Sequence, residues 1–187
     1  MKKRGFTGSI LYWRKGMLLA LGVSALLLPA RSPGEESPSE VALSPVNSIV
    51  NGIISYTRWP QLNGLPRLCI FSSATSASQL AREQNRPVFT PVIVANTDQA
   101  LRENCDAVYF GHESVQQQIA LREQYHGKPQ LYIAEQNPDC SAGSVFCLNI
   151  TDKKISFSVN LDSLSRSGVR VSPDVLMLAR ARKNNDE

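Results

Sequence analysis

Between residues 67 and 134 the sequence alternates short runs of β-forming residues with helical segments, and this alternation restricts the fold more than any other feature. Helical segments are expected near 76–84 and over 114–125, where Ser114 is suited to cap the helix and Gly127 to stop it. The strand-like runs are 67–71 (RLCIF), 91–95 (PVIVA), 107–110 (AVYF) and 131–134 (LYIA). Strands that alternate with helices predict a layered α/β domain in which helices cover a central sheet.

The pattern changes after residue 140. Two strand-like runs, 145–150 and 155–159, are separated only by the polar turn TDKK, which predicts an antiparallel hairpin. In the second run apolar residues alternate with Ser156 and Ser158, so one face of this strand should be packed and the other should be more polar. Since the earlier strands belong to an alternating pattern, the sheet should be mixed.

Helices are expected at both ends of the domain. One helix should run over 41–59 and end near Pro60. Its apolar face consists of residues at three- and four-residue spacing, namely Val46, Ile49, Val50, Ile53, Ile54 and Thr57. The last helix should begin at Ser172, Pro173 and Asp174, which supply a hydroxyl cap, a first-turn proline and a carboxylate. The sequence therefore predicts a single layered α/β domain over 41–183, with a mixed central sheet flanked by helices, a C-terminal hairpin and helix, and a tail at 184–187.

The first 30 residues differ from the rest of the chain. Residues 1–15 contain five basic residues and no acidic one, and the apolar run GMLLALGVSALLLPA follows at 16–30. This order predicts a secretory signal peptide. The run is shorter than the roughly 20 residues that a transmembrane helix needs, so cleavage is favoured over anchoring. Residues 31–40 (RSPGEESPSE) are predicted to be a flexible leader.

Removing the signal changes the charge of the protein. The whole chain has 20 Lys and Arg residues against 16 Asp and Glu residues, but five of the basic residues lie in the signal. The mature chain is therefore close to neutral, which argues against nucleic acid as a partner because phosphate binding needs a basic face. The basic residues near the C-terminus, Arg180, Arg182 and Lys183, are better explained as cations at the negative end of the last helix.

The four cysteines are Cys69, Cys105, Cys140 and Cys147. An even number of cysteines in an exported chain predicts two disulfides, and three pairings are possible. Proximity in the sequence favours Cys140 with Cys147, which leaves Cys69 for Cys105. The spacings contain no Cys-x-x-Cys motif, so neither a zinc site nor a thioredoxin-like redox centre is expected.

Residues for catalysis are sparse. The sequence has no Gly-x-Ser-x-Gly motif and no glycine-rich phosphate loop. His112 and Glu135 each follow a predicted strand, where α/β proteins place functional groups, but no nucleophile accompanies them. We expect His112 to be a loop residue and Glu135 to bind loop amides, so the chain is not predicted to be an enzyme or to carry a cofactor.

Five segments of the domain carry a resemblance to a known family, namely 51–60 (NGIISYTRWP), 68–73 (LCIFSS), 109–114 (YFGHES), 133–140 (IAEQNPDC) and 160–180 (NLDSLSRSGVRVSPDVLMLAR). Together they resemble the YfiR family of periplasmic regulators, and the resemblance extends over about residues 41–183. The resemblance implies a periplasmic repressor of a YfiN-like diguanylate cyclase of the inner membrane. A YfiB-like partner associated with the outer membrane would sequester the repressor and so promote cyclic di-GMP synthesis and biofilm formation.

The resemblance also implies a homodimer with two intramolecular disulfides, and these can be carried onto the four cysteines in the pairing that proximity favours. The disulfides would then be a possible point of redox control. Partner contact is implied for Phe146, Ser158, Leu164 and Arg170. Phe146 could equally be simple core and Leu164 the buried face of a short helix. A periplasmic small-ligand carrier or sensor remains the alternative function, because mixed α/β domains often bind ligands at strand ends.

Overall fold

The computed structural model describes residues 45–82, 84–125, 127–151 and 154–180. The predicted signal peptide, the leader and the C-terminal tail lie outside these ranges, as do Arg182 and Lys183, so these assignments stay predictions. Within the described ranges no helix has the length and apolar character that a membrane span requires.

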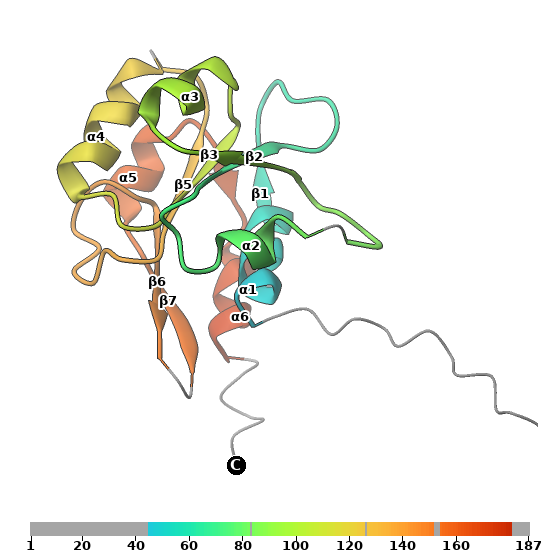
Figure 1. Ribbon diagram of the computed structural model, residues 1–187. Helices are drawn as coiled ribbons and strands as arrows, with labels where there is room; N and C mark the ends of the chain where they lie inside the picture. The colour runs from blue at the N-terminus through green and yellow to red at the C-terminus, as the bar shows by residue number, and fades with distance from the viewer. Residues whose placement is uncertain (1–44, 83, 126, 152–153, 181–187) are drawn as a thin grey trace, which may run out of the picture. The chain divides into compact units, whose positions relative to one another are not determined.

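A six-stranded sheet forms the centre of the domain, in the order β3-β2-β4-β5-β6-β7 (Figure 1). The first five strands in this order are parallel, and β7 is antiparallel to β6. The strands are β2 (Arg67–Phe71), β3 (Thr90–Val94), β4 (Ala107–Phe110), β5 (Leu131–Ala134), β6 (Phe146–Ile150) and β7 (Ile155–Val159). The mixed sheet and the final antiparallel hairpin are therefore confirmed.

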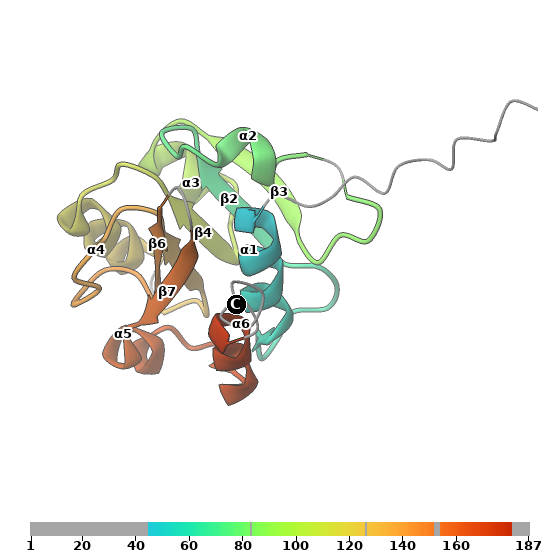
Figure 2. The same cartoon turned by 90° about the horizontal axis from the view of Figure 1, so that it is seen from below.

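Helices cover both faces of this sheet. Figures 1 and 2 show α1 and α6 on one side and α3 and α4 on the other. The helices are α1 (Pro45–Ser55), α2 (Ala77–Leu80), α3 (Thr97–Arg102), α4 (Val115–Gln124), α5 (Leu161–Arg166) and α6 (Met177–Arg180), with the 3-10 helix η1 (Pro173–Leu176) directly before α6. This arrangement confirms the layered α/β fold.

Each face of the sheet has its own hydrophobic core. In β2, Leu68 and Ile70 pack on the face covered by α1 and α2, whereas Cys69 and Phe71 pack on the face covered by α3 and α4. All four side chains are buried. Since a parallel strand between two helical layers is buried on both faces, it carries a continuous apolar run instead of an alternating one.

A second, two-stranded sheet was not predicted. It pairs β1 (Thr57–Arg58) with β8 (Arg170–Val171) in antiparallel orientation. The prediction that the first helix reaches residue 59 was therefore wrong at its end. α1 ends at Ser55, and the Thr57 hydroxyl donates a hydrogen bond back to the Ile53 carbonyl oxygen at 2.8 Å. Strands of two residues are too short to show a periodic pattern.

Other boundaries follow local chemistry. Ser114 and Gln117 form the predicted cap of α4 as a reciprocal capping box, and the Ser172 hydroxyl accepts from the Asp174 amide at the start of η1. α2 is shorter than the expected segment 76–84, and β3 begins and ends one residue before the expected strand 91–95. α3, which is capped by Asn96, was missed because it spans less than two turns.

Candidate functional site

The carboxyl ends of β2 and β4 form the place where an open parallel sheet commonly binds a ligand. Among the strands of this sheet β2 comes first along the chain, and it lies between β3 on one side and β4 on the other. Ligand crevices in such sheets lie where the strand order reverses in this way. The segments that follow the two strands, 72–76 and 111–114, line this position.

These two segments contact each other directly. A Cβ atom on Gly111 would lie 2.2 Å from the Ala74 backbone nitrogen, so only glycine allows this approach. The Glu113 carboxylate accepts hydrogen bonds from the Ser73 hydroxyl at 2.6 Å and from the Gly111 amide at 2.8 Å. The His112 amide donates to the Ser73 hydroxyl oxygen at 3.3 Å. The two loops are therefore joined to each other by their own polar groups.

Glu135, which follows β5, occupies the adjoining position. Its carboxylate accepts hydrogen bonds from the amides of Thr75 and Ser76, each at 2.8 Å, and from the Tyr109 hydroxyl at 2.9 Å. Burial raises the pKa of the Tyr109 phenol, and the nearby Glu135 charge raises this pKa further. The phenol therefore stays protonated and serves as a donor. The prediction that Glu135 binds loop amides is confirmed.

The structure places His112 and Glu135 in different environments. The Glu135 side chain is buried and accepts hydrogen bonds from three groups, whereas His112 is exposed. Among the described residues, no three His, Cys, Asp or Glu side chains are grouped so that they could hold a metal ion.

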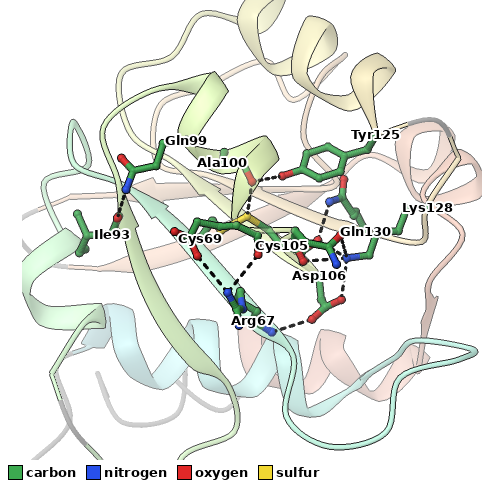
Figure 3. The surroundings of a disulfide bond; sticks show 12 residues. Arg67, Cys69, Ile93, Gln99, Ala100, Cys105, Asp106, Tyr125, Lys128 and Gln130 are labelled. Carbon is green, nitrogen blue, oxygen red and sulfur yellow. Dashed lines mark hydrogen bonds and ion pairs between the residues drawn. A yellow bond between two sulfur atoms is a disulfide. The ribbon is translucent and has the colours of Figure 1, made fainter.

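Two disulfides are present, in the pairing that sequence proximity favours. Cys69 is bonded to Cys105, and Cys140 to Cys147, with Cα–Cα distances of 5.7 Å in both bridges. The first bridge is fully buried and joins β2 to the turn before β4 (Figure 3). The second joins the loop after β5 to β6 and lies closer to the surface.

Side chains from a neighbouring segment hold the first bridge in place. Lys128 Nζ and Gln130 Nε2 donate to the Cys105 carbonyl oxygen at 2.9 and 2.7 Å (Figure 3). Lys128 also forms an ion pair with Asp106 at 3.1 Å, and the Asp106 carboxylate accepts from the Arg67 amide at 2.9 Å. The bridge is thus part of a polar network that links the amino ends of β2 and β4 to the segment before β5.

The structure separates the four candidate contact residues into two kinds. Phe146 is fully buried and packs edge-on against Phe157, with ring centroids 5.6 Å apart, and Leu164 on α5 is partly buried against the same core. Ser158 on β7 and Arg170 on β8 are exposed. In this conformation, only Ser158 and Arg170 present their side chains fully to a partner, and the contact role of all four stays a prediction.

Arg170 has a neighbour that sequence reasoning missed. Arg58 lies directly opposite Arg170 in the two-stranded sheet, and both side chains are exposed. Arg58 Nη1 donates to the carbonyl oxygens of Ser55 and Thr57 at 2.7 and 2.9 Å. The two arginines border a shallow hollow of about 470 Å³, whose wall also includes Tyr56 and Asp174. No pattern in the sequence could pair two residues so far apart along the chain.

A family model described as YfiR/HmsC-like matches residues 46–180, from the start of α1 to the end of α6.

Proposed function

The chain belongs to the YfiR/HmsC-like family, and from this premise we propose that it is a homodimeric repressor of a YfiN-like diguanylate cyclase in the inner membrane. A YfiB-like protein associated with the outer membrane would sequester it and release the cyclase, which would raise cyclic di-GMP and promote biofilm formation. Membership of this family supports a periplasmic regulator of cyclic di-GMP signalling. The two disulfides fit an oxidising compartment.

The family match carries the proposal, and the structural observation that supports a partner surface is the pair of arginines at 58 and 170. Like charges placed directly opposite each other in an antiparallel pair repel, so this arrangement costs the isolated protein free energy. A partner that supplies carboxylates would remove the repulsion and form charge-assisted hydrogen bonds, for which guanidinium geometry is well suited. We therefore place an acidic segment of the partner on the face formed by Arg58 and Arg170, next to Tyr56.

The hydrogen bonds at the strand ends favour this function over a small-ligand sensor. Glu113 and Glu135 already accept hydrogen bonds from the backbone amides of the two loops that follow β2 and β4. An incoming anionic ligand would have to displace these carboxylates. Recognition of a protein at the outer surface requires no such exchange, and a repressor of this kind needs only different affinities for the two states of the cyclase.

Charge reversal tests the arginine pair. Arg58→Glu combined with Arg170→Glu keeps two like charges opposite each other in the two-stranded sheet. The repulsion between them is therefore preserved, while the charge of this surface changes from positive to negative. We expect at least a tenfold weaker affinity for the periplasmic domain of the cyclase in a calorimetric titration, since charge-assisted hydrogen bonds contribute about 1.5–3 kcal/mol each. Cyclic di-GMP in cells should rise accordingly.

The matched control is Arg82→Glu combined with Arg86→Glu, which makes the same change in net charge at two exposed arginines elsewhere. This control should retain the parent affinity. Equal affinity of the parent and the Arg58/Arg170 variant would contradict the assigned surface. An unchanged cyclic di-GMP level after deletion of the gene would contradict the repressor function itself.

A further inference from the structure

The two edges of the six-stranded sheet differ in how they are protected from pairing with another strand. β3 at one edge contains Pro91, which lacks an amide donor. β7 at the other edge has neither a proline nor a charged residue over Ile155–Val159, and it pairs with β6 without a bulge (Figure 1). Prolines, charges and bulges are the usual means of blocking an edge, so β7 is the open one.

The hydrogen-bond pattern shows which groups of β7 point outward. The Thr151 amide donates to the Lys154 carbonyl oxygen at 2.9 Å, and the Asn160 amide donates to the Val145 carbonyl oxygen at 2.8 Å. Because hydrogen-bonded pairs alternate along an antiparallel ladder, Ser156 and Ser158 also bond to β6. The amides and carbonyls of Ile155, Phe157 and Val159 therefore point away from β6. Within the described part of the chain, none of these six groups has a hydrogen-bond partner.

The side chains of β7 are arranged almost symmetrically about Phe157. The strand reads Ile-Ser-Phe-Ser-Val. If a second β7 lies antiparallel to it and centred on Phe157, Ile155 faces Val159, Ser156 faces Ser158 and Phe157 faces Phe157. Apolar side chains then meet on one face and hydroxyls on the other, without any charged residue in the contact. The three outward-pointing residues also fall opposite one another, so their backbone groups are in register.

We propose that β7 pairs with β7 of a second copy of this chain, antiparallel and centred on Phe157. The pairing satisfies the six unpaired backbone groups of each copy and joins two six-stranded sheets into one of twelve strands. It is a closed two-fold contact, because each copy uses the same surface. Phe157 and Val159, which are only partly buried against the core, gain apolar neighbours. The inference rests on the proposed function only in taking the protein as a homodimer.

The test alters the face of β7 that the serines occupy, so that the apolar core is left intact. Ser156 and Ser158 are half-buried and exposed respectively. In the proposed register, Ser156→Lys combined with Ser158→Lys places lysine opposite lysine twice. Ser156→Glu combined with Ser158→Lys places glutamate opposite lysine twice. Sedimentation of the purified mature chain should show at least a tenfold higher dimer dissociation constant for the double-lysine variant and a parent-like constant for the glutamate and lysine variant.

Ser48→Lys combined with Ser78→Lys adds the same charge at two exposed serines outside β7 and should sediment as the parent does. The proposal is overturned if the parent is monomeric at all concentrations, if the double-lysine variant keeps the parent constant, or if both β7 variants dissociate equally. No partner protein is present in this experiment, so such a result would leave the proposed cyclase binding untouched.

Hydrogen exchange gives a second readout that needs no substitution. The amides of Ile155, Phe157 and Val159 should exchange slowly in the dimer and quickly after dilution to the monomer, because only the second copy protects them. The amides of Ser156 and Ser158 should remain slow in both states, since they bond to β6. Equal exchange of the first set before and after dissociation would also overturn the proposal.

Discussion

Glu135 connects three parts of the molecule through one carboxylate. It follows β5, and it accepts hydrogen bonds from the amides of Thr75 and Ser76 in the loop after β2 and from the Tyr109 hydroxyl on β4. The sequence predicts the general role, because an acidic residue after a buried strand lies near the loops at that edge of the sheet. It does not identify the donors, which come from segments distant in the sequence.

Substitution of Glu135 should lower the free energy of unfolding, because it breaks this connection. Glu135→Ala leaves two amides and a phenol without an acceptor, and we expect a loss of about 2–4 kcal/mol in the free energy of unfolding. Glu135→Gln keeps one carbonyl oxygen and should lose less. Urea unfolding of both variants measures the difference. Equal stability of the parent and the alanine variant would show that water replaces the carboxylate without cost.

At the scale of elements, the loops after β2 and β4 contact each other directly at the strand ends. The loops approach so closely at Gly111 and Ala74 that no side chain fits between them. The glycine is visible in the sequence, but its reason is not, because the partner loop lies far from it along the chain. A comparable close approach occurs between α1 and α6, where Gly52 faces the Leu178 side chain.

The two glycines should respond differently to alanine. At Gly111 the new methyl group would meet backbone atoms of Ser73 and Ala74, which cannot move without breaking the loop contact, and we expect a loss of about 2–3 kcal/mol. At Gly52 it would meet the end of the Leu178 side chain, which can rotate, and the higher helix propensity of alanine offsets part of the cost. Thermal unfolding compares the two. A larger loss for Gly52→Ala would refute this explanation.

For the whole molecule, the two disulfides constrain the unfolded chain to different extents. Cys69 and Cys105 are 36 residues apart, and Cys140 and Cys147 are 7 residues apart. On the chain-entropy model the longer loop contributes about 4 kcal/mol and the shorter about 2.5 kcal/mol. The first bridge also lies in the core between the sheet, α3 and α4, where its sulfur atoms pack against apolar side chains.

Replacing both cysteines of one bridge by serine should destabilise the protein in the same order as the two bridges stabilise it. Cys69→Ser with Cys105→Ser should lower the melting temperature more than Cys140→Ser with Cys147→Ser, because it loses both the longer loop constraint and buried packing. The second variant should still melt below the parent and accumulate to a lower level in cells. Calorimetry and quantitative blotting measure these effects. If the Cys140/Cys147 variant matches the parent in both, that bridge contributes nothing to stability.

The sequence by itself determined the features that arise from local patterns. These are the main strands and helices, the final hairpin and the caps at Ser114 and Ser172, each of which depends on residues within a few positions of one another. Short elements such as β1, β8 and α3 were missed because two to six residues give too weak a periodic signal.

Only the tertiary structure decided which distant residues meet. It placed Arg58 opposite Arg170, brought Glu135 to the amides of Thr75 and Ser76, and left β7 at an open edge. The order of strands and the contacts between loops depend on how the whole chain buries its apolar surface and satisfies its backbone hydrogen bonds. A local pattern carries no information on these choices, and they determine where a partner can bind.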